Sequence, residues 1–144
     1  MVTVNEKEKR ELASSAVVAR KRAYVPYSHF SVGAALLTDE GETVTGCNVE
    51  NASYPAGLCA ERVAIFSAVA AGKRHFRGIA VTGGKAGEEP ADFCMPCGMC
   101  LQVMSEFAGP DFEILIVKNE EEIQEYCLRD FLPHTFTSLG EITR

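Results

Sequence analysis

Long apolar runs and an extended basic stripe are both missing from this 144-residue sequence; the most basic stretch, ARKRAY at residues 19–24, is short and suits the negative end of a helix. Without an apolar stretch of about 20 residues, no segment is expected to cross a membrane as a helix. Basic residues number 14 against 20 acidic ones, and the formal net charge is −6 at pH 7. A protein that follows nucleic-acid phosphates normally carries a basic stripe, so we expect neither a nucleic acid polymer nor a membrane as partner.

A secretion signal is also missing. The first residues, MVTVNEKEKRELASS, are polar and charged early, which predicts neither a signal peptide nor a membrane anchor. We therefore expect a cytoplasmic protein. In a reducing compartment, the six cysteines are expected to bind metal or to react more often than to form disulfides.

Internal repeats, low-complexity tracts and linkers are absent as well, which predicts one domain over residues 1–144. Apolar residues recur at helical spacing from residue 5 to 23 and predict an amphipathic helix. The stretch 32–50 predicts a β-hairpin around an Asp-Glu-Gly turn. The segment 59–72 is apolar on nearly every side, so we expect a helix there that is buried on most faces.

Two further apolar runs, 76–84 and 112–118, predict strands that are covered on both faces. A short helix is predicted between them, over 97–107. From residue 119 the chain is acidic, and we expect it to be partly helical and then extended. Because helix and strand alternate through the second half of the chain, we expect an α/β fold with a mixed sheet and helices on both sides.

Three cysteines recur at every third residue in FCMPCGMCLQV, as Cys94, Cys97 and Cys100. Such a run can begin an iron–sulfur site, provide half of a zinc site, or form a redox dithiol. The redox dithiol is the weakest of these, because CGMC lacks the strand and turn that precede it in thioredoxin-like sites. A structural zinc or iron–sulfur module stays open, although it leaves Cys59 and Glu61 without a role.

A second grouping pairs Cys97 and Cys100 with Cys59. Cys59 opens one predicted helix and the other two lie in the first turn of another, where free N–H groups favour thiolates. Three thiolates leave one tetrahedral position of zinc open, which is typical of a catalytic site. Glu61 is too near Cys59 in sequence to be a ligand beside it, but its carboxylate can move a proton at the metal.

The zinc-deaminase signature is H-x-E followed by P-C-x-x-C, with Cys allowed at the His position. The sequence reads Cys59–Ala60–Glu61 and then Pro96–Cys97–Gly98–Met99–Cys100. With these motifs, and with PYSHFSVGAAL and GCNVENASYPAGLCAER, the chain resembles the short, single-domain, homotetrameric cytidine deaminases. The resemblance extends from the first helix to Phe136.

This resemblance implies a three-layer α/β/α fold with a mixed central sheet of about five strands. It implies one Zn²⁺ per chain, held by Cys59, Cys97 and Cys100, and a homotetramer with shared active sites. The implied reaction converts cytidine and deoxycytidine to uridine and deoxyuridine plus ammonia, as zinc-activated hydroxide attacks C4 and Glu61 shuttles the proton.

The resemblance also implies where a nucleoside would bind. The expected substrate-binding residues are Phe30, Asn48, Glu50, Tyr54, Ala60 and Phe136. Asn48 and Glu50 would bind the ribose hydroxyls, Phe30 would pack near the base, and the N–H of Ala60 would meet the pyrimidine O2. Tyr54 and Phe136 would reach the pocket from a neighbouring subunit. From the residues alone, a polar loop that caps the next helix is the favoured interpretation of Asn48 and Glu50, although their i, i+2 spacing points both the same way and their groups suit sugar hydroxyls.

The sequence departs from the family at Leu101, where an Arg usually follows the second cysteine pair. Zn²⁺ with three thiolates carries a net negative charge, which opposes ionisation of a bound water, and cations near the sulfurs offset it. Arg62 is present for this purpose, but its partner is missing. We therefore expect the protein to be active, with an altered dependence of its rate on pH. Leu101→Arg is expected to lower the pKa that governs the acidic side of the pH–rate curve.

Two rival substrates are considered. A deaminase of blasticidin S or of a modified nucleoside is disfavoured because a ribose-binding Glu50 has no use on a substrate without that sugar. A deaminase that edits polynucleotides is disfavoured by the acidic composition. Outside the motif, Cys47 and Cys127 are expected to be small buried apolar residues, and Cys94 a bystander next to the site.

Overall fold

The computed structural model describes residues 3–137, which form a five-stranded sheet in the order β2-β1-β3-β4-β5. The strands are β1 (Phe30–Thr38), β2 (Thr43–Cys47), β3 (Phe76–Lys85), β4 (Glu113–Val117) and β5 (Ile123–Cys127). The β3–β4 pair is parallel and the other three pairs are antiparallel. The expected mixed sheet is thus confirmed.

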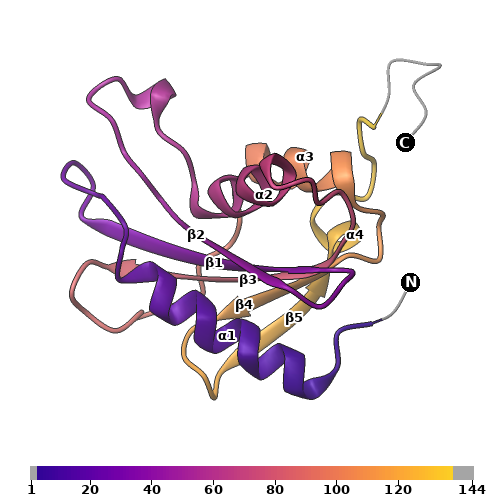
Figure 1. The fold of residues 1–144 in the computed structure, drawn as a ribbon. Helices are drawn as coiled ribbons and strands as arrows, with labels where there is room; N and C mark the ends of the chain where they lie inside the picture. Colours follow the sequence, from indigo (N-terminus) through magenta and orange to yellow (C-terminus); the bar gives the residue numbers. More distant parts are fainter. Residues whose placement is uncertain (1–2, 138–144) are drawn as a thin grey trace.

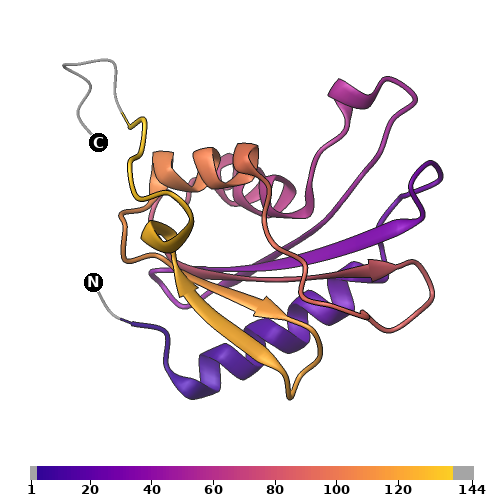
Figure 2. The ribbon, with the colours of Figure 1, turned by 180° about the vertical axis from the view of Figure 1, so that it is seen from behind.

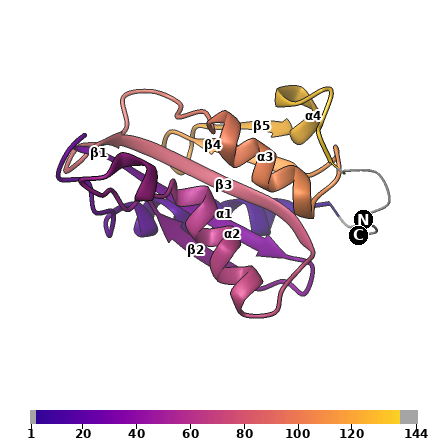
Figure 3. The ribbon, with the colours of Figure 1, turned by 90° about the horizontal axis from the view of Figure 1, so that it is seen from above.

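Helices cover both faces of this sheet. They are α1 (Glu6–Arg20), α2 (Ala60–Ala70), α3 (Gly98–Phe107) and the short α4 (Leu128–Phe131), with a 3-10 turn, η1, at Tyr54–Ala56. Helix α1 lies on one face, and α2 and α3 lie together over the other (Figures 1 and 3). Each face has its own apolar cluster, so the expected three-layer α/β/α architecture is confirmed.

Two glycines let the helices approach the sheet closely. A Cβ at Gly33 in β1 would lie 2.2 Å from the carbonyl oxygen of Ala16 in α1. A Cβ at Gly46 in β2 would lie 2.5 Å from the carbonyl oxygen of Ala60 and equally close to the backbone nitrogen of Ala64. Because backbone atoms cannot move aside as a flexible side chain can, any larger residue at these positions would push a helix off the sheet.

Helix α1 begins at a capping box, in which the Asn5 side chain accepts from the Glu8 N–H and the Glu8 carboxylate accepts from the Asn5 N–H. It ends at Arg20, three residues earlier than expected. The reason lies in Tyr24, whose N–H donates to the Asn48 carbonyl and whose carbonyl accepts from the Glu50 N–H. The chain must leave the helical path to form this bridge.

One expectation for the second half of the chain is wrong, and another is incomplete: α4 is the expected helical part after residue 119, but the strand before it was not expected. Helix α2 buries one side, but Phe66 on its other side is 41% exposed, because only the sheet and α3 cover it in the single chain. The acidic segment after residue 119 forms the edge strand β5 before the short α4. Its residues are mostly half-buried on both sides, so no alternation in the sequence marked a strand, and pairing with β4 determines the structure.

Within residues 3–137, no helix has both the length and the apolar character to span a membrane.

Glu8 supplies a prediction about stability. Its carboxylate accepts two hydrogen bonds from the Arg77 guanidinium, at 3.0 and 2.7 Å. Those bonds hold the pKa of Glu8 below its ordinary value of 4.5, so the stabilisation is present above that pH and is lost as pH falls through the lower folded-state value. We expect Glu8→Gln to lower the free energy of unfolding by about 1–3 kcal/mol at pH 7, and the difference to shrink below pH 4.

Urea denaturation at pH 7 and at pH 3.5 measures this difference. Glu11→Gln is the matched control on the same helix, since Glu11 is 59% exposed and lies 3.8 Å from Lys7, a pair expected to contribute little. A Glu8→Gln effect equal at both pH values would contradict the electrostatic origin.

Candidate metal centre

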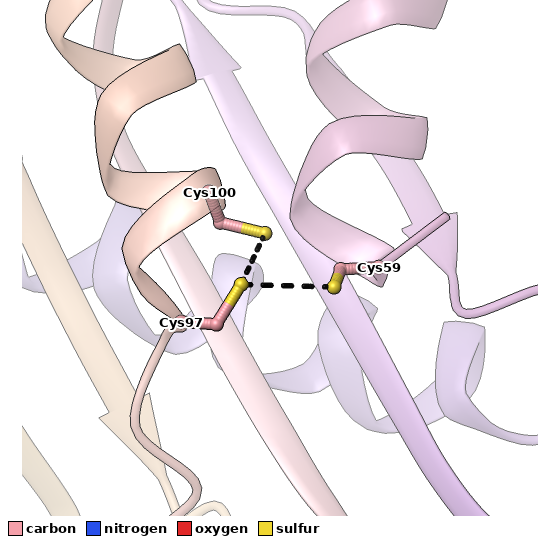
Figure 4. A group of neighbouring side chains, drawn as sticks. All are labelled: Cys59, Cys97 and Cys100. Atoms are coloured by element: carbon pink, nitrogen blue, oxygen red, sulfur yellow. Dashed lines mark hydrogen bonds between the residues drawn. The ribbon is translucent and has the colours of Figure 1, made fainter. Parts of the chain in front are cut away.

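Three cysteine side chains meet where two helices begin (Figure 4). Cys59 is the N-cap of α2, Cys97 is the N-cap of α3, and Cys100 lies in the first turn of α3. The Sγ atoms of Cys59 and Cys97 are 3.8 Å apart, and those of Cys97 and Cys100 are 3.5 Å apart. All three lie within 4.8 Å of one another, which singles them out as a metal-binding group within the described part of the chain.

The sulfur positions fit a zinc ion. Tetrahedral Zn²⁺ with Zn–S bonds of about 2.3 Å separates its sulfur ligands by roughly 3.8 Å. Cys100 is buried, Cys59 is half-buried and Cys97 is exposed, so the group is open to solvent on one side. Three thiol ligands with an accessible fourth direction are the arrangement of a catalytic zinc site, not of a closed structural one.

Hydrogen bonds among the thiols move the pKa values of Cys59 and Cys100 in opposite directions. Hydrogen bonds from Cys100, Arg62 and Cys97 hold the pKa of the Cys59 thiol well below its usual range. The Cys100 thiol has a raised pKa, because it keeps its proton in the bond to Cys59 and is also buried. A cysteine that its neighbours hold toward the thiolate form, in a group placed at two helix N-termini, suits the binding of a cation, and metal binding to thiols releases protons.

Arg62 is the cation beside this group. Its Nη2 lies 3.4 Å from the Cys59 Sγ, its Nε is buried without a hydrogen-bond partner, and its pKa is raised by the bond to Cys59. Leu101 is 6% exposed and packs in the apolar cluster under α2 and α3. The position that holds an Arg in the family pattern therefore contributes apolar packing here, and Arg62 is the guanidinium that contacts the sulfurs.

We expect Arg62→Ala to weaken zinc binding by about 10- to 100-fold, since it removes the donor that holds the Cys59 thiolate. Competition with a chromogenic zinc chelator measures the affinity. Arg74→Ala is the control, because the Arg74 guanidinium lies elsewhere and donates to the carbonyls of Val69 and Lys73. Equal zinc affinity in the Arg62 variant and the native protein would contradict the role. The Leu101→Arg variant is tested by measuring its rate of deamination against pH. The thermal unfolding temperature of the same sample shows whether a change comes from lost packing or from the added charge.

Glu61 is the buried acid of the site. It lies in the first turn of α2, two residues after Cys59, and is 4% exposed. Burial, with a further contribution from the Cys59 charge, raises the pKa of this carboxyl to about 7. A carboxyl with that pKa can both take up and release a proton near neutral pH.

Cys94 stands apart from the three-thiol group. A Cβ at Gly83 would lie 2.8 Å from the Cys94 Sγ and 3.1 Å from a ring carbon of Phe30, so Cys94 packs on β3 next to Phe30. Burial raises the pKa of its thiol to about 11, which disfavours the thiolate that metals bind. The structure thus joins Cys97 and Cys100 to Cys59 and not to Cys94.

Asn48 and Glu50 both hold the turn that carries Phe30. The Asn48 side chain donates to the Phe30 carbonyl at 2.9 Å and accepts from the Val32 N–H at 2.8 Å. The Glu50 carboxylate accepts from the N–H groups of Tyr27 and Ser28, both at 3.1 Å. No pattern in the sequence indicates these bonds, which orient both side chains and shape the turn at the same time.

The three aromatic residues are exposed in the single chain: Phe30 by 42%, Tyr54 by 69% and Phe136 by 63%. Tyr54 lies on the excursion between β2 and α2, which projects from the body of the molecule (Figure 1). Phe136 follows α4, where its carbonyl accepts from the Gln102 side chain at 2.8 Å. Tyr54 and Phe136 therefore lie on separate parts of the chain, whereas Ala60 is fully buried beside Cys59 at the start of α2.

The chain is similar in sequence and in structure to known proteins that carry a zinc-binding region. The family model described as the cytidine and deoxycytidylate deaminase zinc-binding region matches residues 6–116. A Halalkalibacterium halodurans protein named cytidine deaminase is 41% identical over 131 residues, which cover 91% of this chain and 96% of the relative. The crystal structure of a cytidine deaminase from Burkholderia pseudomallei superimposes with a TM-score of 0.79 and 46% identity, over 88% of this chain and 97% of that chain.

A more distant relative, named blasticidin-S deaminase, comes from Bacillus cereus. It is 31% identical over 109 residues, which cover 74% of this chain and 76% of the relative. The family model spans well over half of the chain and includes all three cysteines of the metal-binding group. The chain therefore belongs to the family of zinc-dependent cytidine and deoxycytidylate deaminases.

Proposed function

We propose that this protein hydrolyses cytidine and deoxycytidine to uridine and deoxyuridine with release of ammonia. The observation that carries the proposal is the buried Glu61 carboxyl at the start of α2, two residues after Cys59, which forms the three-thiol group with Cys97 and Cys100 of α3. A proton carrier beside an open metal position is what hydrolysis of an amidine-like C–N bond requires.

The residues divide the work as follows. Cys59, Cys97 and Cys100 would hold one Zn²⁺, which when bound supplies a Lewis acid that makes water nucleophilic at neutral pH. Glu61 accepts a proton from the attacking water and delivers it to N3 of the pyrimidine, and a second transfer accompanies the departing ammonia. Because Glu61 is 4% exposed, bulk water does not compete for that proton. Arg62 holds the Cys59 thiolate in place.

The nucleoside would lie over the turn that Asn48 and Glu50 stabilise. Asn48 keeps one N–H and one lone pair beyond its two backbone bonds, and the carboxylate of Glu50 is only partly buried. Both groups would bind the ribose hydroxyls. Phe30 would pack near the base, and the backbone N–H of Ala60 at the α2 start would donate to the pyrimidine O2.

We further propose a cytoplasmic homotetramer whose subunits share active sites. Phe66, Tyr54 and Phe136 are exposed by 41%, 69% and 63%, and aromatic surface of this kind favours association. Tyr54 and Phe136 would then complete the pocket of a neighbouring subunit. Light scattering after gel filtration is expected to give four times the 15.6 kDa chain mass, and a monomer with full activity would contradict shared sites.

A substrate panel tests the proposed activity. We expect ultraviolet absorbance to report turnover of cytidine and deoxycytidine, and little turnover of free cytosine, which offers no sugar to Asn48 and Glu50. Blasticidin S is the competing substrate, because one relative of the chain carries that name. Faster turnover of blasticidin S than of cytidine would overturn the proposal in favour of that alternative. Glu50→Gln is expected to raise KM for cytidine, because the loss of the carboxylate charge weakens its bonds to the ribose hydroxyls.

A further inference from the structure

Residues 85–92, here called the 85–92 loop, lead from the end of β3 toward the cysteines of α3. One side chain of α1, which lies on the face of the sheet opposite α3, is hydrogen-bonded to the backbone of this loop. Arg20, the last residue of α1, donates from Nη1 to the Glu88 carbonyl at 2.8 Å and from Nη2 to the Lys85 carbonyl at 2.6 Å. Its Nε donates to the Ser31 carbonyl in β1 at 3.0 Å. Every nitrogen of the guanidinium is thus bonded to backbone.

The surroundings of Arg20 are shaped to admit this bridge. A Cβ at Gly84 would lie 3.0 Å from the Arg20 Nη2 and 2.8 Å from the Cα of Pro90. At Gly33, a Cβ would lie 2.4 Å from the Arg20 backbone nitrogen. A side chain at either glycine would displace the guanidinium, the loop or the end of α1. Glycine at both positions therefore leaves room for the Arg20 side chain.

Packing does little to hold the loop in place. Residues 85–89 are all exposed, and a cavity of about 230 Å³ separates the loop from the end of α1. Arg20 and Lys21 line this cavity on one side and residues 86–89 of the loop line it on the other. Figure 2 shows the loop extending past the end of β3, at the same end of the molecule as the C-terminus of α1. Hydrogen bonds therefore fix the loop where apolar contacts do not.

The loop connects to the substrate side of the site. The Ala86 N–H donates to the His29 carbonyl at 2.8 Å, and Lys85 pairs with Phe30 in the β1–β3 ladder. His29 has a φ of 58°, a left-handed conformation that costs a non-glycine residue energy and persists only when its neighbours hold it. The loop is one of those neighbours, so its position bears on the turn that carries Phe30.

The loop also connects to the metal side of the site. After Pro90 the chain passes to Cys94, which packs on Gly83, and then to Cys97 at the start of α3. No regular structure lies between the end of β3 and Cys97. The path of this segment is set at its start by the loop that Arg20 holds, and farther along by the packing of Cys94.

We propose that Arg20 is a positioning residue for the metal site and for the Phe30 turn, acting through the 85–92 loop from the opposite face of the sheet. The part of this inference that concerns substrate rests on the proposed function. The part that concerns the loop and the zinc ion does not, since it needs only the geometry of this chain.

Three variants test the inference in the zinc-loaded full chain. Arg20→Ala removes all three bonds, Arg20→Lys keeps the charge and at most one of the two loop bonds, and Lys21→Ala removes a neighbouring exposed charge as the control. Loop opening is followed by mass spectrometry as cleavage of the Glu88–Glu89 bond by a glutamate-specific protease. Zinc transfer to a chromogenic chelator is timed, and KM and kcat for cytidine are measured.

Arg20→Ala is expected to increase loop cleavage by roughly tenfold or more, because charged hydrogen bonds that close the loop are lost. We also expect faster zinc transfer and a higher KM, with Arg20→Lys intermediate and Lys21→Ala equal to the native protein. Native-like cleavage and zinc transfer in Arg20→Ala would overturn the inference. If Arg20→Ala does not fold, the same two readouts on Arg20→Lys decide it. Absence of cytidine turnover in the native protein would instead refute the proposed function and leave both readouts valid.

Discussion

Replacement of Glu61 by Gln is expected to leave the zinc ion bound and to lower kcat for cytidine by roughly 10²- to 10⁴-fold, the range over which positioned acid–base groups act. Glutamine has nearly the shape of glutamic acid and fits the same buried position at the start of α2. It can donate and accept hydrogen bonds, but it cannot take a proton from water and pass it on. The variant therefore separates proton transfer from metal binding.

Zinc content by elemental analysis and cytidine turnover by absorbance, on one sample, measure both sides of this expectation. Glu121→Gln is a suitable control, since Glu121 is exposed at the turn before β5. Turnover close to the native rate in Glu61→Gln would remove Glu61 from the mechanism. Loss of zinc in that variant would instead assign Glu61 a role in building the site.

Replacement of Cys59 by Ser is expected to weaken zinc binding by more than the roughly 100-fold that changes beside the ligands cause, and to abolish turnover with it. Serine is not ionised at neutral pH and is a poor zinc ligand compared with a thiolate. The Cys59 and Cys97 sulfurs are 3.8 Å apart across two helices, so this cysteine links α2 to the metal and its loss affects both helix ends.

Cys94→Ser is the matched control for that change. Cys94 packs on Gly83 and lies outside the three-thiol group, so its replacement is expected to keep zinc and most of the activity. The opposite pattern, with metal lost from Cys94→Ser and kept in Cys59→Ser, would support the module built on Cys94, Cys97 and Cys100. Visible charge-transfer absorption in the purified protein would identify such a module as an iron–sulfur site.

The metal-binding group could be predicted because short sequence patterns at two helix starts specify its residues. Cys97 and Cys100 are three residues apart at a helix start, and Cys59 with Glu61 lies at another helix start. The sequence pattern therefore specifies the direction of each sulfur once the helices are recognised. Only the packing of the two helices side by side on the sheet is non-local; for α2, Gly46 permits it, since its missing side chain lets α2 lie against β2.

Other features depend on contacts between distant segments and had no pattern in the sequence. The hydrogen bonds of Arg20 join residues 65 and 68 positions apart along the chain, and at the end of a helix a basic residue is expected for the dipole alone. Strand β5 lacks alternation because it is an edge strand with half-buried residues. The exposed side of α2 could not be anticipated, since a helix apolar on all sides can face either a core or another subunit.

Zinc content and cytidine deamination, measured on one sample before and after removal of the metal, test the central claim most directly. We expect one zinc ion per chain and conversion of cytidine to uridine. We also expect loss of that activity when a chelator removes the zinc and recovery when zinc is restored. Full deamination by the zinc-free protein, or a zinc-loaded protein that leaves cytidine unchanged, would contradict it.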